Sequence, residues 1–263
     1  MHRLLTISPP SIDVIGDKCR AGGPALYAGA IFTKLGGRAY ALGPVGYLTC
    51  YTVKVEERLG VERIGYHDNY EGLVFRIVYE NHHRRIWLET RKRTFEPSII
   101  LTQLRKLGVV DAILLSPIYG EEWGSLQPLI AMHSRLTALD VQGYVRIGLD
   151  PVSSRGAIHI VHGSSDEIVG GFPVHYTVIT DGPGEIRLEK WGRVYHKMMP
   201  RGGVLRDPTG AGDGFTAALL YHLLEGYPLE DAVEMASEAV YSLLPEVHGE
   251  IWIEECNRIV KLV

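Results

Sequence analysis

Cysteine is scarce in this sequence. Only Cys19, Cys50 and Cys256 occur among its 263 residues, and they lie far apart. An odd number at such spacing fits neither a disulfide framework nor a zinc site built from Cys-x-x-Cys pairs. We therefore expect three free thiols in a reducing compartment, which points to the cytoplasm.

Long apolar segments and a strong net charge are also missing. No run approaches the roughly 18 apolar residues of a membrane-spanning helix, and Pro9 and Pro10 break the first apolar segment too early for a signal peptide. The formal net charge of -4 gives no general attraction for nucleic acid. We expect neither a membrane nor a nucleic acid as partner.

Basic residues gather only at 82–85 and 91–93, which we interpret as a solvated loop or hairpin tip. A nucleic-acid-binding module that uses these residues is the minor alternative.

What the sequence does contain is an alternation of short apolar runs with longer segments of helical period. This pattern is typical of a parallel sheet covered by helices on both faces, so we expect an α/β protein with residues 1–263 in a single domain. The expected strands cover residues 4–7, 39–42, 112–116, 136–140, 158–161 and 174–180. The expected helices cover residues 24–35, 97–107, 121–134, 211–225, 229–244 and 251–260.

One stretch interrupts this alternation. Strong β-forming residues at 72–80 and 85–89 flank a polar tip at 81–84, which predicts a β-hairpin. Because the hairpin lies between two α/β units, joining the main sheet would disturb the crossover connections. We therefore place it as a small flap, at about residues 66–91, over one sheet edge. An ordinary surface hairpin is the alternative.

The segment with the clearest chemical content is 206–220. Small residues at 209–212 lead directly into a helical pattern, so the first backbone N–H groups of the helix can face open space. Such a helix start binds anions such as phosphate. Asp213, in the same first turn, can take the proton of an attacking hydroxyl. Phosphoryl transfer mainly requires positioning, charge neutralisation and such a base.

A purely structural interpretation of these residues is the alternative. Gly210 and Gly212 can make a tight turn, and Asp213 can cap the helix. The segment is not a Walker loop, because no Gly-Lys-Ser/Thr follows. The complete string is nevertheless far more specific than an isolated Gly-x-Gly.

The string Asp207-Pro208-Thr209-Gly210-Ala211-Gly212-Asp213 resembles the C-terminal signature of the ribokinase-like (PfkB-type) carbohydrate and nucleoside kinases. The resemblance implies a three-layer α/β/α sandwich with a mainly parallel central sheet and a small β-hairpin lid. It also implies that Asp213 is the catalytic base, that residues 210–212 form an anion hole, and that Thr209 lies near the donor phosphates.

Other segments follow this family's order, so the resemblance covers nearly the whole chain. Asp13 and the Gly22-Gly23 turn are implied to hold the substrate polyol. Tyr27 stands where many members carry asparagine, which suggests a differently shaped polyol. The segment from Asp140 to Arg146 resembles archaeal members related to inositol kinases.

Two residues of that last segment, Gln142 and Arg146, are further substrate-binding candidates. An ordinary loop with polar residues explains them equally well.

Three weaker similarities imply which residues bind the phosphoryl donor. Ser164-Ser165-Asp166-Glu167 is similar to the family's Asn-x-x-Glu, which makes Glu167 a candidate for the magnesium shell, with a helix capping box as the alternative. Thr180, Gly182 and Gly184 resemble the nucleotide-binding region, although a turn between strands also explains them. His248 is a candidate neighbour of the adenine, although a turn that connects two helices explains it as well.

The sequence therefore predicts a magnesium-dependent kinase that moves the γ-phosphoryl group of ATP to a hydroxyl of a sugar or cyclitol. A myo-inositol-like polyol is the first expectation, followed by ribokinase-type sugars and nucleosides. The alternative is a non-catalytic sugar or nucleotide sensor on the same fold. Exposed Phe75, Tyr79 or Trp87 on the lid would let two copies pair as a homodimer.

Overall fold

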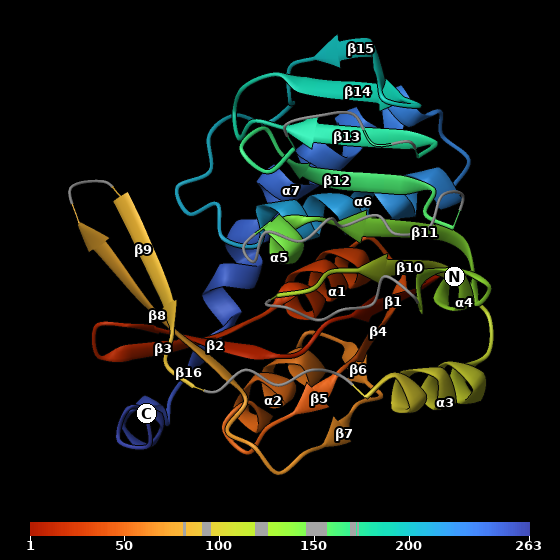
Figure 1. The fold of residues 1–263 in the computed structure, drawn as a ribbon. Coiled ribbons are helices and arrows are strands. Elements are labelled where there is room, and N and C mark those ends of the chain that lie inside the picture. Colours follow the sequence, from red (N-terminus) through yellow and green to blue (C-terminus); the bar gives the residue numbers. More distant parts are fainter. Residues whose placement is uncertain (81–82, 91–95, 119–125, 146–156, 169–171, 173) are drawn as a thin grey trace.

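The computed structural model describes residues 1–80, 83–90, 96–118, 126–145, 157–168, 172 and 174–263. Its main sheet has nine strands, in the order β15-β14-β13-β12-β11-β10-β1-β4-β6 (Figure 1). In chain order these are β1 (Arg3–Ile7), β4 (Arg38–Leu42), β6 (Val61–Arg63), β10 (Val110–Leu115), β11 (Ser134–Asp140), β12 (Ile160–Ser164), β13 (Tyr176–Thr180), β14 (Ile186–Lys190) and β15 (Arg193–Met198).

The direction of the strands agrees with the sequence pattern. Along the order of the sheet, every pair of neighbouring strands between β13 and β6 is parallel. The two antiparallel pairings, β13 with β14 and β14 with β15, lie at one edge, so β14 alone runs against the other strands of this sheet. The predicted mainly parallel sheet is therefore confirmed.

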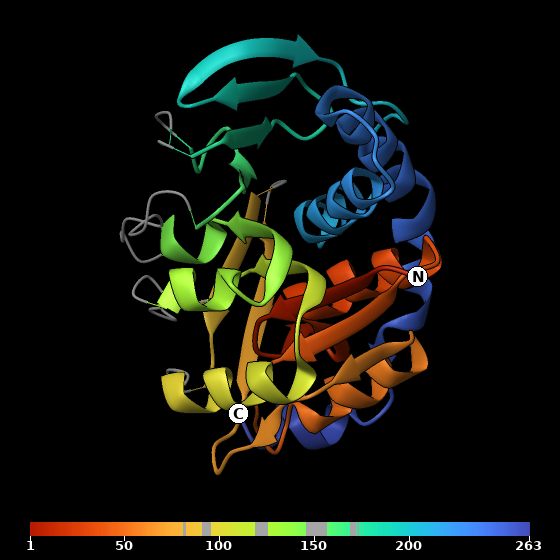
Figure 2. The same cartoon turned by 90° about the vertical axis from the view of Figure 1, so that its right-hand side faces the viewer.

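Helices cover both faces of this sheet (Figure 2). One face carries α1 (Pro24–Lys34), α2 (Cys50–Arg58), α6 (Ala211–Leu224) and α7 (Leu229–Glu250). The other carries α3 (Pro97–Leu107), α4 (Gln127–Ala131) and α5 (Gln142–Val145). Neighbouring residues of β1 show why both faces must be apolar: Leu4 belongs to the core under α1 and α6, whereas Leu5 belongs to the core under α3.

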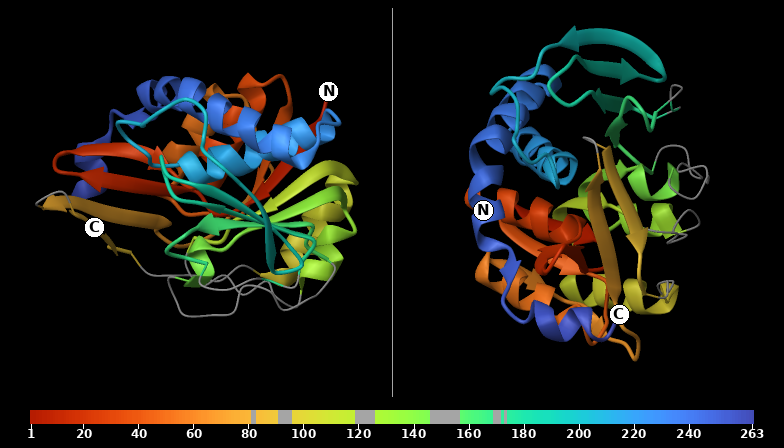
Figure 3. Two further views of the ribbon diagram at one scale, coloured as in Figure 1. Left: turned by 90° about the horizontal axis from the view of Figure 1, so that it is seen from above. Right: turned by 90° about the vertical axis from the view of Figure 1, so that its left-hand side faces the viewer.

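A second, five-stranded sheet projects from one end of the molecule (Figures 1 and 3). It consists of β16 (Trp252–Ile253), β3 (Lys18–Gly22), β2 (Ser11–Ile15), β8 (Leu73–Glu80) and β9 (His83–Leu88), in that order. The predicted hairpin is formed by β8 and β9, and its second strand begins at His83 rather than at residue 85. We call this assembly the lid sheet. A separate two-stranded sheet pairs β5 (Pro44–Val45) with β7 (Tyr66–His67).

Two predicted helices are wrong in part. Residues 251–260 form not one helix but β16 followed by α8 (Cys256–Val260), because Trp252 and Ile253 pair with β3 of the lid sheet. Within 121–134 only α4 is a described α-helix, and Ser134 already begins β11. In both places pairing with a distant strand overrides the local helical pattern.

The prediction of three free thiols is also wrong. Cys19 on β3 and Cys256 on α8 form a disulfide across a sequence separation of 237 residues. The pairing of β16 with β3 brings the two side chains together, and sequence spacing contains no trace of it. Cys50 is a free, half-buried thiol. The disulfide removes the reason for expecting a reducing compartment, so the cytoplasmic location stays a prediction.

No helix in the described part of the chain is both long enough and apolar enough to cross a membrane.

The disulfide gives a direct test of the lid sheet's attachment. Cys256→Ser should lower the free energy of unfolding by about 2–4 kcal/mol, since the bond closes a very long loop in the unfolded chain. Urea denaturation without reductant measures the difference. Cys50→Ser is the matched control and should change stability by less than about 0.5 kcal/mol. Equal stability of Cys256→Ser and the wild type would contradict the bond.

Candidate active site

A cavity of about 540 Å³ lies at the carboxyl ends of the parallel strands, between the main sheet and the lid sheet. Ser116 follows β10, and Asp140, Ser164 and Thr180 end β11, β12 and β13. The chain passes from β1 to β4 on one side and later to β10 on the other, so β1 and β10 bound the point where strand order reverses. Open α/β sheets bind ligands at such points.

The start of α6 forms the floor of this cavity. Gly210 has a positive φ of 78°, and no side-chain hydrogen bond caps the helix start among the described residues. A Cβ at Gly210 would overlap the ring of Tyr27, so only glycine allows this approach. Gly212 also lines the cavity, and a Cβ there would come 3.4 Å from the His162 ring. The glycines thus keep the first turn of α6 close to the cavity. The N–H of Ala211 itself donates to the carbonyl oxygen of Pro208 at 3.0 Å, so the donors proposed for an anion are those that follow it in this turn.

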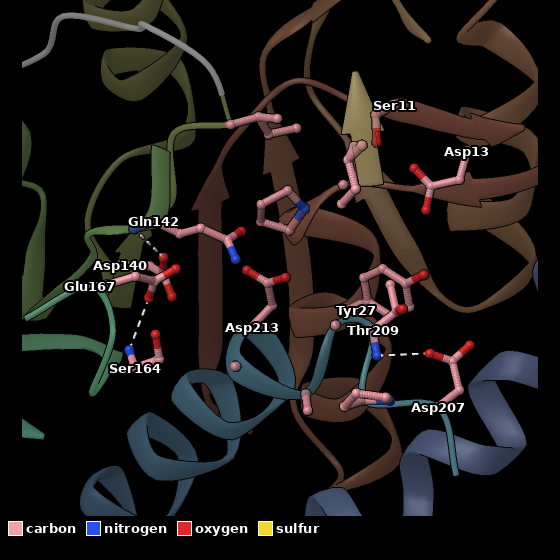
Figure 4. A pocket seen from close by; sticks show the side chains of 18 of the residues that line it. Ser11, Asp13, Tyr27, Asp140, Gln142, Ser164, Glu167, Asp207, Thr209 and Asp213 are labelled. Carbon is pink, nitrogen blue, oxygen red and sulfur yellow. Dashed lines mark hydrogen bonds between the residues drawn. The ribbon is translucent and has the colours of Figure 1, made fainter. Parts of the chain in front are cut away.

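Asp213 occupies the centre of the cavity wall (Figure 4). It lies in the first turn of α6, between the side chains of Gln142 and Tyr27 in this view. Ser116 Oγ donates a hydrogen bond of 3.2 Å to Asp213 Oδ1. A half-buried carboxylate that faces a cavity beside a helix start has the geometry of a general base.

The polar wall opposite α5 comes from the lid sheet and α1. Ser11, Asp13, Gly23 and Tyr27 line the cavity there. Gly22 does not line it, but a Cβ at Gly22 would sit 2.9 Å from Ser11 Oγ. Its role is therefore to leave room for the lining side chains.

Tyr27 is 2 % exposed, and its hydroxyl has no hydrogen-bond partner among the described residues. Burial, followed by the nearby carboxylate of Asp13, holds the pKa of this phenol far above its ordinary value, so the hydroxyl keeps its proton.

On the other side of Asp213, Gln142 lines the cavity and its backbone N–H donates to Asp140 Oδ1 at 3.0 Å. Glu167 and Ser164 lie next to it (Figure 4). The backbone N–H of Ser164 donates to Glu167 Oε2 at 2.9 Å, which is one half of the capping box considered above. Arg146 lies outside the described residues.

The nucleotide candidates divide into two groups. Thr180, Gly182, Thr209 and Gly210 line the cavity. Gly184 does not, and its N–H closes a turn on the carbonyl of Asp181. His248 is not among the lining residues either, and its Nε2 lies 2.9 Å from the carbonyl oxygen of Thr209.

Sequence reasoning assigned no role to two buried polar residues of this site. His162 lines the cavity, with Nδ1 at 3.2 Å from Asp140 Oδ2 and at 3.0 Å from Thr216 Oγ1. Arg20 lies directly behind the lining residues and binds Asp13. Their only sequence signal is a polar side chain inside a short strand that is otherwise buried.

The cavity carries a strongly negative set of side chains. Five carboxylates line it, and its described lining residues include neither lysine nor arginine. The carboxylates are those of Asp13, Asp140, Glu167, Asp207 and Asp213. Burial alone would raise the pKa of Asp207, but hydrogen bonds from Thr209 and the charge of Arg20 lower it below its ordinary value. Arg20, behind the wall, offsets part of this charge through its ion pairs with Asp13 and Asp207, and a cation that offsets the rest would favour the entry of a polyphosphate.

Apolar side chains close the cavity from the lid side. Phe75, Ile77 and Ile86 come from β8 and β9, and Ile118 follows β10. Phe75 is 7 % exposed, so the prediction that it offers a surface to a second copy is wrong. Trp87 is exposed, whereas the side chain of Tyr79 lies outside what the structure describes. Pairing through the lid stays a prediction.

Residues 178–240 match the model of the pfkB family carbohydrate kinases. This is the family predicted from the sequence. The match confirms the class of enzyme as well, a phosphotransferase with an alcohol group as acceptor. No curated protein sequence matches the chain.

Solved structures extend the likeness to the whole fold. The ribokinase of Thermotoga maritima is 16% identical, with a TM-score of 0.72, over 99% of this chain and 100% of that one. A pyrophosphate-dependent kinase of the ribokinase family, complexed with a pyrophosphate analog and myo-inositol, is 17% identical with a TM-score of 0.70, over 92% and 94%. Anopheles gambiae adenosine kinase is 12% identical with a TM-score of 0.69, over 92% and 98%. The ribokinase-like three-layer fold is thus confirmed.

The close approach of Gly210 to Tyr27 gives a testable prediction. Gly210→Ala should destabilise the protein by about 1–3 kcal/mol beyond the cost of a positive φ, because the methyl group meets the ring. It should also lower kcat by about 10²-fold, since the helix start is displaced.

Gly226→Ala is the matched control, because Gly226 follows the same helix with a φ of 94° and a Cβ there meets open space. Thermal unfolding and turnover are measured on both variants. Equal losses in the two would show that the ring contact has no part in the effect.

Proposed function

We propose that this protein is a kinase that transfers the γ-phosphoryl group of ATP to a hydroxyl of an unphosphorylated polyol, with a cyclitol such as myo-inositol as the first candidate. The observation that carries the proposal is the position of Asp213. Its carboxylate faces the cavity from the first turn of α6, next to backbone N–H groups that suit a phosphoryl group and opposite a wall that suits hydroxyls.

The acceptor is proposed from the chemistry of that wall. Asp13 and Ser11 offer oxygen atoms to a polyol, and Gln142 offers an amide. The hydroxyl of Tyr27 has no partner among the described residues, and an acceptor hydroxyl would supply one. The five carboxylates repel an acceptor that already carries a phosphate. The structural neighbour bound to myo-inositol supports a cyclitol.

The reaction needs one proton transfer and one displacement. Asp213 accepts the proton of the acceptor hydroxyl, and the oxygen then forms a bond to the γ-phosphorus while the bond to the bridging oxygen of ADP breaks. The N–H groups and dipole at the start of α6 offset the negative charge on the transferred group. Phe75 and Ile77 on the lid keep water, a competing acceptor, away from it.

A magnesium ion would fit this site if phosphates and water supply most of its ligands. Among the described residues there is no cluster of three or more side chains that could hold an ion. Mg²⁺ bound to phosphates usually takes only one or two carboxylates and keeps its waters, and Glu167 lines the cavity in a position to serve such an ion. The ion would neutralise phosphate charge that the acidic cavity cannot offset.

Asp213→Asn tests the general base. The variant should fold and bind ATP as the wild type does, while kcat falls about 10²-fold or more, because asparagine cannot accept the proton. Asp231→Asn is the control, since Asp231 is an exposed carboxylate in the first turn of α7. A coupled assay of ADP release measures both. Wild-type turnover in Asp213→Asn would remove the mechanism.

A panel of donors and acceptors tests the specificity. We expect turnover with ATP, Mg²⁺ and neutral polyols, none with sugar phosphates, and complete loss on addition of EDTA. Pyrophosphate is the second candidate donor, because one of the structural neighbours is a pyrophosphate-dependent kinase. Thermal stabilisation by polyol and nucleotide with no turnover on any donor would instead identify a sensor.

A further inference from the structure

Arg20 is an almost fully buried arginine that uses all three of its guanidinium nitrogens. Nε donates to Asp13 Oδ2 at 3.2 Å, one terminal nitrogen donates to Asp207 Oδ2 at 2.7 Å, and the other donates to Thr209 Oγ1 at 3.0 Å. The residue is 2 % exposed. Burial alone would lower the pKa of Arg20, but the nearby Tyr27, Asp13 and Asp207 raise it, so the group stays charged.

These contacts join two parts of the site that are far apart in sequence. Arg20 and Asp13 face each other on the paired strands β3 and β2 of the lid sheet. Asp207 and Thr209 belong to the loop that leads into α6, 187 and 189 residues further along the chain. Asp13 and Thr209 both line the cavity, one on the acceptor side and one on the phosphate side.

The guanidinium is a rigid plane, so its donors cannot shift independently. A displacement of Asp13 toward a bound polyol therefore moves the plane and with it the hydroxyl of Thr209. Asp207 also accepts a hydrogen bond of 3.0 Å from the backbone N–H of Thr209, which ties this loop to the same group. When a bound polyol orders the side chain of Asp13, the free-energy cost of ordering the loop at Asp207 and Thr209 then falls.

We propose that Arg20 is a positioning residue that couples polyol binding at Asp13 to the phosphate-binding loop at residues 207–210. The inference rests on the proposed function, since it assumes that polyol and nucleotide occupy the two sides of this cavity. Each ligand then raises the affinity for the other by the same factor, as thermodynamic linkage requires.

A purely structural role for Arg20 makes a different prediction. A buried ion pair can hold a fold together without any coupling between ligands. Arg63 provides the matched control, because its side chain is as buried as that of Arg20 and binds Glu56, with 2.6 Å between Nε and Oε2, whereas Glu56 does not line the cavity as Asp13 does. Arg63→Met should cost stability without changing the coupling.

The test measures the dissociation constant of the non-hydrolysable analogue AMP-PNP with Mg²⁺ by calorimetry, with and without the polyol of lowest KM in the acceptor panel. We expect the polyol to tighten AMP-PNP binding about fivefold or more in the wild type and in Arg63→Met. In Arg20→Met the factor should fall to about one, and kcat/KM for the polyol should fall about 10²-fold.

Arg20→Lys is the second variant, because it keeps the buried positive charge and decides the question if Arg20→Met does not fold. Its ammonium cannot span all three acceptors, so its coupling factor should also fall below that of the wild type. Wild-type coupling in either Arg20 variant, or a factor of one in the wild type itself, would overturn the inference. The proposed function fails separately, if the wild type transfers no phosphoryl group from any donor.

Discussion

The contact between the backbone at Gly210 and the ring of Tyr27 fixes where α6 begins, and the other parts of the site are placed relative to that helix start. Tyr27 belongs to α1, which packs against α6 and the main sheet around a common core. Phe215 and Ala218, the second and fifth residues after Asp213, anchor α6 in that core. Asp213 therefore points into the cavity from a helix that cannot shift without disturbing the interior.

The negative charge of the cavity explains why different groups are proposed to bind the phosphates and the acceptor. With five carboxylates on the described lining, the proposed function requires that backbone N–H groups, the helix dipole and an accompanying cation offset the phosphate charge. Arg20 supplies no direct help, because Asp13, Asp207 and Thr209 already engage its guanidinium. In the proposed function the same carboxylates would suit the hydroxyls of a neutral polyol and disfavour an anionic acceptor.

The lid sheet is built from three parts of the chain that are separate in sequence. Strands β2 and β3 come from the first 22 residues, β8 and β9 from the hairpin, and β16 from the last part of the chain. The Cys19–Cys256 disulfide fastens α8 to β3, next to Arg20. The wall proposed to bind the acceptor thus belongs to a sheet that is cross-linked at one edge. This sheet presents polar side chains from β2 and apolar side chains from β8 and β9 to the cavity.

The sequence by itself determined the elements whose signals are local. The alternation of apolar strands with helical periods predicted the parallel sheet, the β-forming runs predicted the hairpin, and the segment 207–213 predicted a phosphate-binding helix start with a carboxylate, because each depends on neighbouring residues alone. Only the tertiary structure decided the pairing of Cys19 with Cys256 and the strand at Trp252. The same holds for the three hydrogen-bond partners of Arg20 and for the position of His162 in the cavity wall. These depend on contacts between residues tens to hundreds of positions apart, and such contacts leave no periodic pattern in a single sequence.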